Sequence, residues 1–157
     1  MNTGTRVTAD IATRIRAAGI DDSALLLPLL HELGYPGTLQ SASARWRSTR
    51  AATPRACWWS MVKEAGTLAG LIAGHLIPLL HQPGNLGRIT ALIVARDAQE
   101  RGVGTALLAA IERWFAAQNC LRYEVTSGDQ RAAAHRFHAC RGYVSDERRS
   151  IKRSPAS

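Results

Sequence analysis

A short apolar run stands directly before a glycine-containing loop and a long amphipathic stretch, and this order constrains the fold most. The run covers 88–95 (RITALIVA), and its nearly continuous hydrophobicity predicts a strand buried on both faces. The stretch Val103–Ala117 carries apolar residues at helical spacing, and these form a single stripe. A buried strand followed by such a helix predicts a mixed sheet with helices on its faces.

The remaining elements surround this strand and helix in a simple order. Asp21, Asp22 and Ser23 indicate a helix start, because side-chain oxygens and negative charge are favourable at that end. Gly34 and Pro36 end that helix. We further predict strands at 13–20, 57–63, 67–77, 121–126 and 143–152, helices at 39–49 and 130–140, and loops at 81–87 and 96–104. The length of 157 residues suits one domain over 11–153 after a flexible tail over 1–10.

The basic character of the chain suggests an anionic partner. The formal net charge is +8, and residues 131–153 hold seven basic side chains against two acidic ones. Zinc-finger spacing, a basic heptad helix and an aromatic-rich basic strand are all missing from the sequence, so we do not expect nucleic-acid binding. Three scattered cysteines predict neither a disulfide framework nor a metal site. The apolar stretches are shorter than a membrane span, so we expect a cytoplasmic protein without a membrane partner.

The loop before the amphipathic helix has the chemistry of a phosphate site. Its sequence from Gln99 is Gln-Glu-Arg-Gly-Val-Gly-Thr, ending at Thr105. Glycines allow close backbone approach, and the first amides of a helix have no partner inside that helix. The loop is neither a P-loop, since it lacks the lysine, nor a dinucleotide fingerprint, since Leu107 stands where the third glycine is needed. A glycine turn used only for packing is the alternative.

At these residues the chain resembles the GNAT-type N-acetyltransferases. Gln99, Gly102 and Gly104 match the family's Q/R-x-x-G-x-G/A motif, and 134–143 (AHRFHACRGY) is similar to its A-x-x-F-Y-x-x-x-G-F/Y segment. The resemblance covers about 12–152. It implies a mostly antiparallel central sheet flanked by about four helices and splayed after the central strand. It also implies that acetyl-CoA is the cosubstrate. The residues implied to bind it are Leu92, Ile93, Val94, Gln99, Glu100, Arg101, Gly102, Val103, Gly104 and Thr105. Arg131 stands where many relatives carry an asparagine, and it either brings a cation towards the CoA phosphates or is a solvated charge.

The catalytic residues depart from the family pattern. His138 stands where relatives often carry a tyrosine, so it is either the general acid for the leaving thiolate or a residue that only lines the cofactor slot. Ala91 stands where many relatives carry a glutamate. The general base must then come from elsewhere, and His75, His81 and Glu124 are the candidates. Each of these three could instead have a purely structural role.

We therefore expect acetyl transfer to a primary amine by direct attack in a ternary complex. A non-catalytic CoA-binding or regulatory module on the same fold is the alternative. The acceptor is expected to be a small-molecule amine, with a protein amine as the second choice, and the family suggests a homodimer. The stretch 70–75 (GLIAGH), His81 and 134–137 (AHRF) look most similar to aminoalkylphosphonate acetyltransferases, although this weaker likeness does not identify the acceptor.

Overall fold

The computed structural model describes residues 14–32, 34, 37–38, 40–41, 43–44, 47–48, 56–62, 66–127 and 132–145. These residues belong to two compact units, one ending at Val125 and the other beginning at Thr126. The first unit contains a five-stranded sheet and its helices, and the second contains helix α5 (Ala132–Ala139). The single domain over 11–153 and the tail over 1–10 stay predictions.

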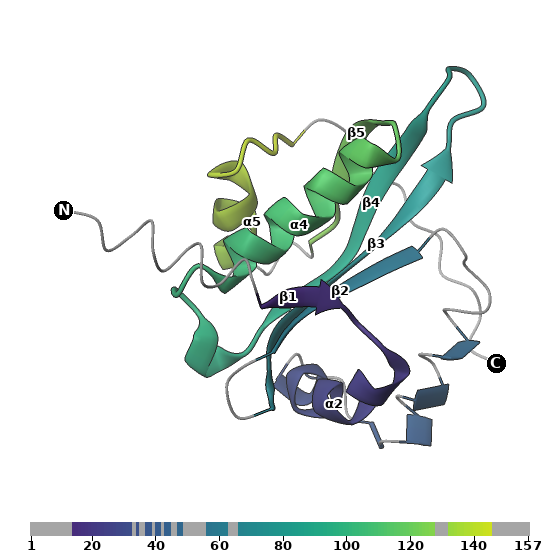
Figure 1. Cartoon of the computed structure of the whole chain (residues 1–157). Helices are drawn as coiled ribbons and strands as arrows, with labels where there is room; N and C mark the ends of the chain where they lie inside the picture. The colour runs from purple at the N-terminus through teal and green to yellow at the C-terminus, as the bar shows by residue number, and fades with distance from the viewer. Residues whose placement is uncertain are drawn as a thin grey trace, which may run out of the picture. The chain divides into compact units, whose positions relative to one another are not determined.

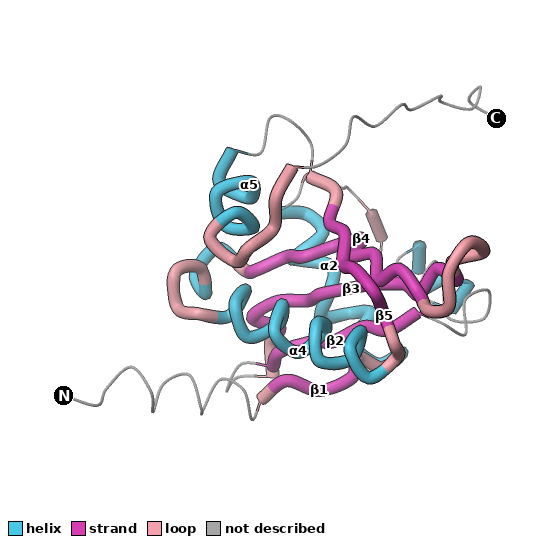
Figure 2. Tube along the Cα trace, turned by 90° about the horizontal axis from the view of Figure 1, so that it is seen from above, coloured by secondary structure: helices cyan, strands magenta, loops and turns pink. Residues whose placement is uncertain are grey.

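The sheet is mixed and mostly antiparallel, which confirms the predicted fold class. Its strands lie side by side in chain order (Figure 2): β1 (Ile15–Ala17), β2 (Ala56–Val62), β3 (Leu68–Pro78), β4 (Asn85–Val94) and β5 (Cys120–Val125). Every neighbouring pair is antiparallel except β4 and β5, which are parallel. The parallel pair follows from the helix that crosses over between these two strands.

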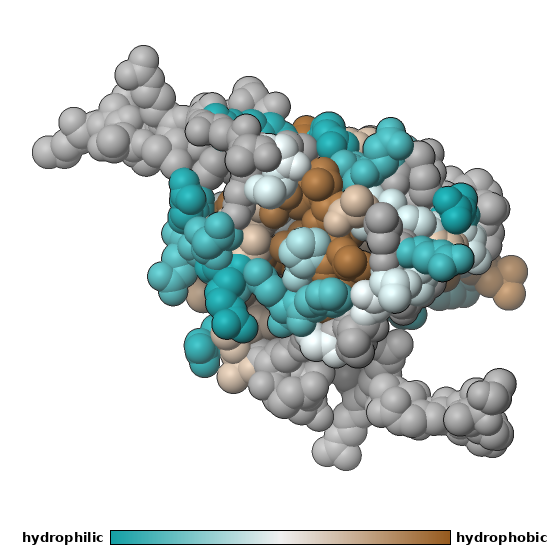
Figure 3. Space-filling model, turned by 90° about the horizontal axis from the view of Figure 1, so that it is seen from below, coloured by the Kyte–Doolittle hydropathy of each residue, from teal (hydrophilic) through white to brown (hydrophobic). Residues whose placement is uncertain are grey.

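Helices cover both faces of the sheet. Helix α4 (Val103–Ala117) lies along one face and has the predicted bounds, and α2 (Ser23–Glu32) lies against the other face (Figure 1). Short 3-10 turns precede them, η1 (Ile20–Asp22) and η2 (Arg96–Ala98). In the view from below, hydrophobic residues gather at the centre with hydrophilic ones around them (Figure 3). The described residues between 40 and 48 are helical, and the rest of the helix predicted at 39–49 lies outside the described residues.

The predicted start of α2 is fixed by one buried carboxylate. Asp22 accepts hydrogen bonds from both terminal nitrogens of Arg16, each at 2.7 Å, and from the Gly19 amide at 2.7 Å. The Arg16 guanidinium and these hydrogen bonds lower the pKa of the Asp22 carboxyl despite its burial. The ion pair therefore ties β1 to the beginning of α2.

Three predicted elements differ from the structure. The strand predicted at 13–20 is shorter, because β1 covers only Ile15–Ala17 and η1 begins at Ile20. The loop expected at 81–87 is too long, because β4 already begins at Asn85 and pairs with Pro78. Gly87 therefore lies inside a strand, and it is there for packing rather than for a turn. Of the final strand predicted at 143–152, residues 143–145 are described and are not in a strand; the rest lies outside the described residues.

Helix α4 approaches the sheet over a surface lined by glycine. A Cβ atom on Gly70 would lie 2.9 Å from Leu107 Cδ1, and one on Gly74 would lie 2.5 Å from Ile111 Cδ1. A Cβ atom on Gly87 would lie 2.6–2.8 Å from three ring carbons of Phe115, which is itself fully buried. Larger side chains at these three positions would hold α4 away from β3 and β4.

Gly87→Ala is expected to lower the free energy of unfolding by about 1–3 kcal/mol, because the new methyl group overlaps the Phe115 ring. In a Phe115→Leu background the same substitution should cost less, since the flat ring is gone and the two changes couple. Urea unfolding of the four proteins in this cycle measures both costs. Equal costs in the two backgrounds would contradict the proposed contact.

Candidate active site

Strands β4 and β5 part halfway along β4, and this fork is the first component of the site. β3 pairs with β4 from Asn85 to Val94, whereas β5 pairs only with Asn85–Ile89. Among the described strands, none pairs with Thr90–Val94 on the β5 side. The second half of β4 therefore presents one edge without a strand partner, as the predicted splay requires.

The alternation of the strand decides which backbone groups face that edge. The Ala95 amide donates to the Ala69 carbonyl at 2.8 Å, so Ala95 and every second residue before it direct their backbone groups towards β3. Ile93 consequently faces β3, and Leu92 and Val94 face the unpaired edge. Gln99 Nε2 approaches the Val94 carbonyl oxygen at 3.4 Å, in agreement with this assignment. Of the three predicted backbone contacts, two therefore lie on the unpaired edge.

A short turn connects the unpaired end of β4 to the start of α4, so the two follow one another directly along the chain. Gly102 is the N-cap residue, with a left-handed φ of 82° and no side-chain cap. The Ala106 amide donates to the carbonyl of the N-cap residue Gly102 at 3.0 Å, so the amides of Val103 and Gly104 come before this bond. The first turn of α4 holds no acidic residue. This end of the helix thus offers amide donors and the positive end of the helix dipole.

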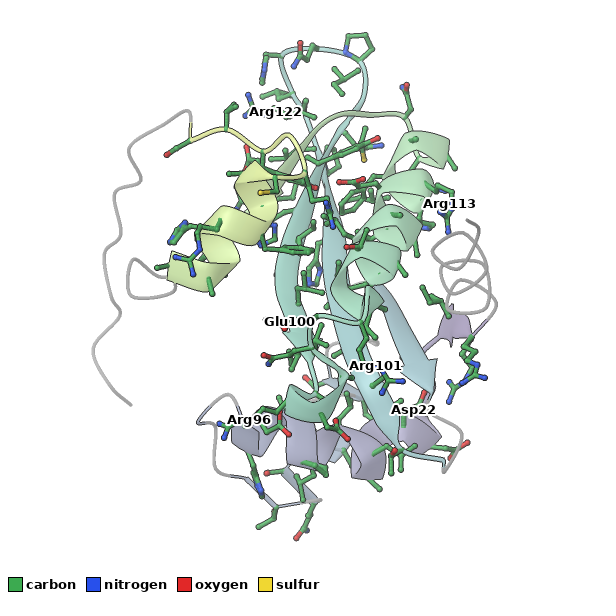
Figure 4. All side chains as sticks on the ribbon, turned by 90° about the vertical axis from the view of Figure 1, so that its left-hand side faces the viewer. Asp22, Arg96, Glu100, Arg101, Arg113 and Arg122 are labelled. Atoms are coloured by element: carbon green, nitrogen blue, oxygen red, sulfur yellow. The ribbon has the colours of Figure 1, made fainter. Side chains whose placement is uncertain are left out.

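Charged and polar side chains surround this turn. Glu100 and Arg101 lie beside the start of α4, and Arg96 lies further away, on η2 near α2 (Figure 4). All three are exposed, as is Gln99. Glu100 has a φ of 60°, an unusual conformation for a residue other than glycine or asparagine. The Arg96 amide donates to Glu32 Oε2 at 2.9 Å, which anchors the turn to the end of α2. The motif from Gln99 to Thr105 therefore comprises an exposed turn and the first residues of α4.

A group of ionisable residues lies on the other face of the sheet, at the fork. Because Gly74 and Gly87 face α4, their neighbours His75 and Arg88 face the opposite side, and these two are paired across β3 and β4. Arg88 is also the register partner of Glu124 on β5, one position before the last pair of the parallel ladder. We call His75, Arg88, Arg122 and Glu124 the fork cluster.

Glu124 is the central acceptor of the fork cluster. Its Oε2 accepts from Arg88 Nη2 at 2.8 Å, and its Oε1 accepts from Arg122 Nη2 at 3.2 Å. The Arg88 Nε atom is buried and has no hydrogen-bond partner among the described residues. Both oxygens of Glu124 are therefore already engaged by arginine side chains, which makes Glu124 a poor choice of general base.

The two histidine candidates for the base lie in different surroundings. His75 is half-buried, and this desolvation lowers the pKa of its imidazole below the ordinary value, so the ring is largely neutral near neutral pH. His81 is exposed in the loop between β3 and β4, beyond the end of β3 at Pro78. The structure therefore brings His75, and not His81, to the fork.

His138 lies in the second unit, on α5. Its ring packs edge-on against Phe137 and Tyr143, with centroids 5.3 Å and 5.6 Å away. Its carbonyl oxygen accepts the Tyr143 amide at 3.1 Å, where Gly142 ends the helix with a φ of 86°. The side chain is buried, and within the described part of the chain its Nδ1 has no hydrogen-bond partner. Burial and the neighbouring His135 lower the pKa of His138.

Sequence reasoning missed two members of the fork cluster as site residues. From the sequence, Arg88 is only the first residue of the buried run at 88–95, and Arg122 is only one residue of the strand predicted at 121–126. The available signal was alternation, because Arg122 and Glu124 are two residues apart on one strand and must share a face. The predicted Arg131 lies outside the described residues, and Arg136 is exposed on α5.

Among the described residues, every helix is too short or too polar to span a membrane. Within the same part of the chain, no group of three histidine, cysteine, aspartate or glutamate side chains could hold a metal ion.

Comparisons with known proteins agree with the geometry. Residues 27–143 match the model of the acetyltransferase (GNAT) family. A search of curated proteins found no match.

Several solved structures share the fold. A GNAT family acetyltransferase from Staphylococcus aureus has a TM-score of 0.76 at 22% identity, covering 89% of this chain and 97% of that one. Glucosamine-6-phosphate N-acetyltransferase from Arabidopsis thaliana has a TM-score of 0.75 at 16% identity, covering 88% and 96%. Ribosomal-protein-alanine N-acetyltransferase from Brucella melitensis has a TM-score of 0.76 at 13% identity, covering 89% and 99%. Identities this low establish the fold alone.

Proposed function

Because the chain belongs to the acetyltransferase (GNAT) family, we propose that it transfers an acetyl group from acetyl-CoA directly to a primary amine while both substrates are bound. One observation carries this proposal: the unpaired edge of β4 runs towards the turn that opens α4. CoA has an extended pantetheine arm and a pyrophosphate. The unpaired edge of β4 suits the arm, and the start of α4, which comes next along the chain, suits the pyrophosphate.

The unpaired edge suits the pantetheine arm of acetyl-CoA. This arm carries amide groups, and an extended chain with amides can pair with a strand edge through main-chain hydrogen bonds. Leu92 and Val94 supply the backbone donors and acceptors for that pairing, while Ile93 keeps its own with β3. The partial exposure of the Leu92 and Val94 side chains is compatible with a ligand beside the strand.

The start of α4 suits the pyrophosphate. The amides of Val103 and Gly104 and the positive end of the helix dipole attract an anion, and the first turn carries no competing carboxylate. Gly102 permits the left-handed turn that exposes these amides. Arg101 is exposed in the same turn and adds positive charge, which Glu100 partly offsets.

Gly104→Glu tests this assignment. The new carboxylate should repel the pyrophosphate and weaken acetyl-CoA binding about tenfold or more, although negative charge in a first turn favours the helix itself. Calorimetry measures the binding, and thiol release from acetyl-CoA across a panel of primary amines measures the transfer. Ala116→Glu adds the same charge at the exposed far end of α4 and should leave acetyl-CoA binding unchanged.

Three outcomes of this experiment are decisive. Amine-dependent thiol release by the wild type, lost in Gly104→Glu, supports the acetyltransferase. Binding of acetyl-CoA without thiol release on any amine would favour the non-catalytic CoA-binding module instead. A wild-type protein that neither binds acetyl-CoA nor releases thiol would overturn both readings.

His75 is the base in this proposal. The acceptor amine must lose a proton to attack the thioester carbonyl, and a neutral imidazole can accept it directly or through a water molecule. Burial keeps His75 neutral at lower pH than an ordinary histidine. Direct attack needs no cysteine nucleophile, and burial raises the pKa of the Cys120 thiol, which opposes such a role.

His75→Gln is expected to lower kcat about 100-fold or more, with little change in acetyl-CoA binding. The wild-type rate should fall as pH drops through the pKa of His75, which lies below about 6.5, because the base becomes protonated. The variant should lack this fall. Steady-state kinetics over pH, with His81→Gln as the matched variant, separates the two histidines: a loss in His81→Gln alone would move the role to the loop.

His138 is the proton donor to the departing thiolate in this proposal. Its lowered pKa means that only a minor fraction is protonated near neutral pH, and that fraction shrinks further as pH rises. His138→Ala should therefore reduce kcat most at acidic pH. His138→Tyr should retain activity at alkaline pH, because a phenol stays protonated to about pH 10. If kcat of His138→Ala is unchanged across the pH range, His138 is not the proton donor and only lines the cofactor slot.

A further inference from the structure

We propose that the amine acceptor carries an anionic group, a carboxylate or a phosphate, and that Arg88 and Arg122 of the fork cluster bind it. This inference rests on the function proposed above and specifies its substrate class. It follows from where the cluster lies, from its unequal charges and from the unsatisfied donor on Arg88.

The fork cluster lies where an acceptor must meet the acetyl group. Arg88 and Glu124 form the last but one register pair before β5 leaves β4, and the unpaired edge begins two residues after Arg88. The cluster occupies the sheet face opposite α4, so an acceptor on that face does not compete for the start of the helix. The sheet thereby separates an acceptor side from the helix that would hold the pyrophosphate.

The charges of the cluster favour an anion over a second cation. One carboxylate, Glu124, serves two guanidiniums, and each of its oxygens already has an arginine partner. An acceptor ammonium would find no unpaired carboxylate in this group. Each guanidinium has five N–H donors and binds a carboxylate or phosphate through two of them at once.

The arginines keep donors and surface for such a ligand. Glu124 engages one terminal nitrogen of each, and the Arg88 Nε atom has no hydrogen-bond partner among the described residues. The side chains of Arg88 and Arg122 are 35% and 52% exposed. A salt bridge that only joined β4 to β5 would add little to the stability of the fold at such exposure. It would also need one arginine rather than two.

The distance from the base sets the size of the acceptor. His75 and Arg88 are direct cross-strand partners, and such pairs have Cβ atoms about 5 Å apart. Because the Arg88 guanidinium extends towards Glu124 on β5, the amine at His75 and the anion at Arg88 are expected to be a few bonds apart on one small acceptor. Short amino acids and aminoalkyl phosphates have this spacing.

Matched acceptors test the proposal. β-Alanine is compared with β-alaninamide, and O-phosphoethanolamine with ethanolamine, by thiol release from acetyl-CoA. The charged member of at least one pair should have the higher kcat/KM, by about tenfold or more. A preference in the first pair alone identifies a carboxylate, and one in the second pair alone identifies a phosphate; either result supports the proposal.

Variants then assign the preference to the cluster. Arg122→Gln should lower kcat/KM for the charged acceptor about tenfold to a hundredfold and leave the neutral one unchanged. Glu124→Gln should instead raise the ratio of kcat/KM for the charged acceptor to that for the neutral one, because it removes the carboxylate that competes for the arginines. A bridge with only a structural role predicts no such rise. Arg113→Gln removes an exposed arginine from α4 (Figure 4) and should leave the ratio unaltered.

The failure of this inference can be told apart from failure of acetyl transfer. Turnover of neutral amines at rates equal to their charged counterparts would overturn the inference and leave the transferase intact. So would a Glu124→Gln protein with an unchanged ratio. If no amine is acetylated, calorimetry of β-alanine and O-phosphoethanolamine binding decides: binding lost in Arg122→Gln supports the anion site, and no binding overturns it.

Discussion

The close contact of α4 with the glycine-lined face of β3 and β4 sets how the parts of the site within the first unit are arranged. Gly70, Gly74 and Gly87 leave room for Leu107, Ile111 and Phe115, so the helix lies directly against the strands. The near end of this contact sets where the first amides of α4 stand relative to the end of β4. At the far end Phe115 packs against Tyr123, with ring centroids 5.3 Å apart, and thereby holds β5 beside β4.

The fork follows from the way this contact holds only part of β5. The parallel ladder runs from Asn85 to Ile89 and stops where β4 has its irregularity opposite Ala73 and Gly74. Thr90 is the extra residue there, and its hydroxyl approaches the Ala73 carbonyl at 3.4 Å. Such a bulge changes the direction of a strand and often ends pairing. The same irregularity thus produces both the unpaired edge and the boundary of the fork cluster.

The two faces of the sheet divide the work between them. Strand alternation that turns Gly74 and Gly87 towards α4 turns His75 and Arg88 away from it. Residues that pack against α4 therefore alternate along β3 and β4 with residues that carry ionisable side chains on the other face. Basic side chains therefore also gather on β4 and β5, where Arg88 and Arg122 share one carboxylate, and not only within 131–153.

The sequence correctly predicts the elements that depend on local pattern. The stripe of α4, the buried run of β4 and the glycine turn between them are written in neighbouring residues, and so were the family motifs. It misjudged Gly87 as a loop residue, because a glycine that accommodates Phe115 from 28 positions away is identical in sequence to one that makes a turn. That His75, Arg88 and Glu124 share one face at the fork is evident only in the folded chain. Their meeting depends on strand register, which is set by long-range pairing and not by the residues beside them.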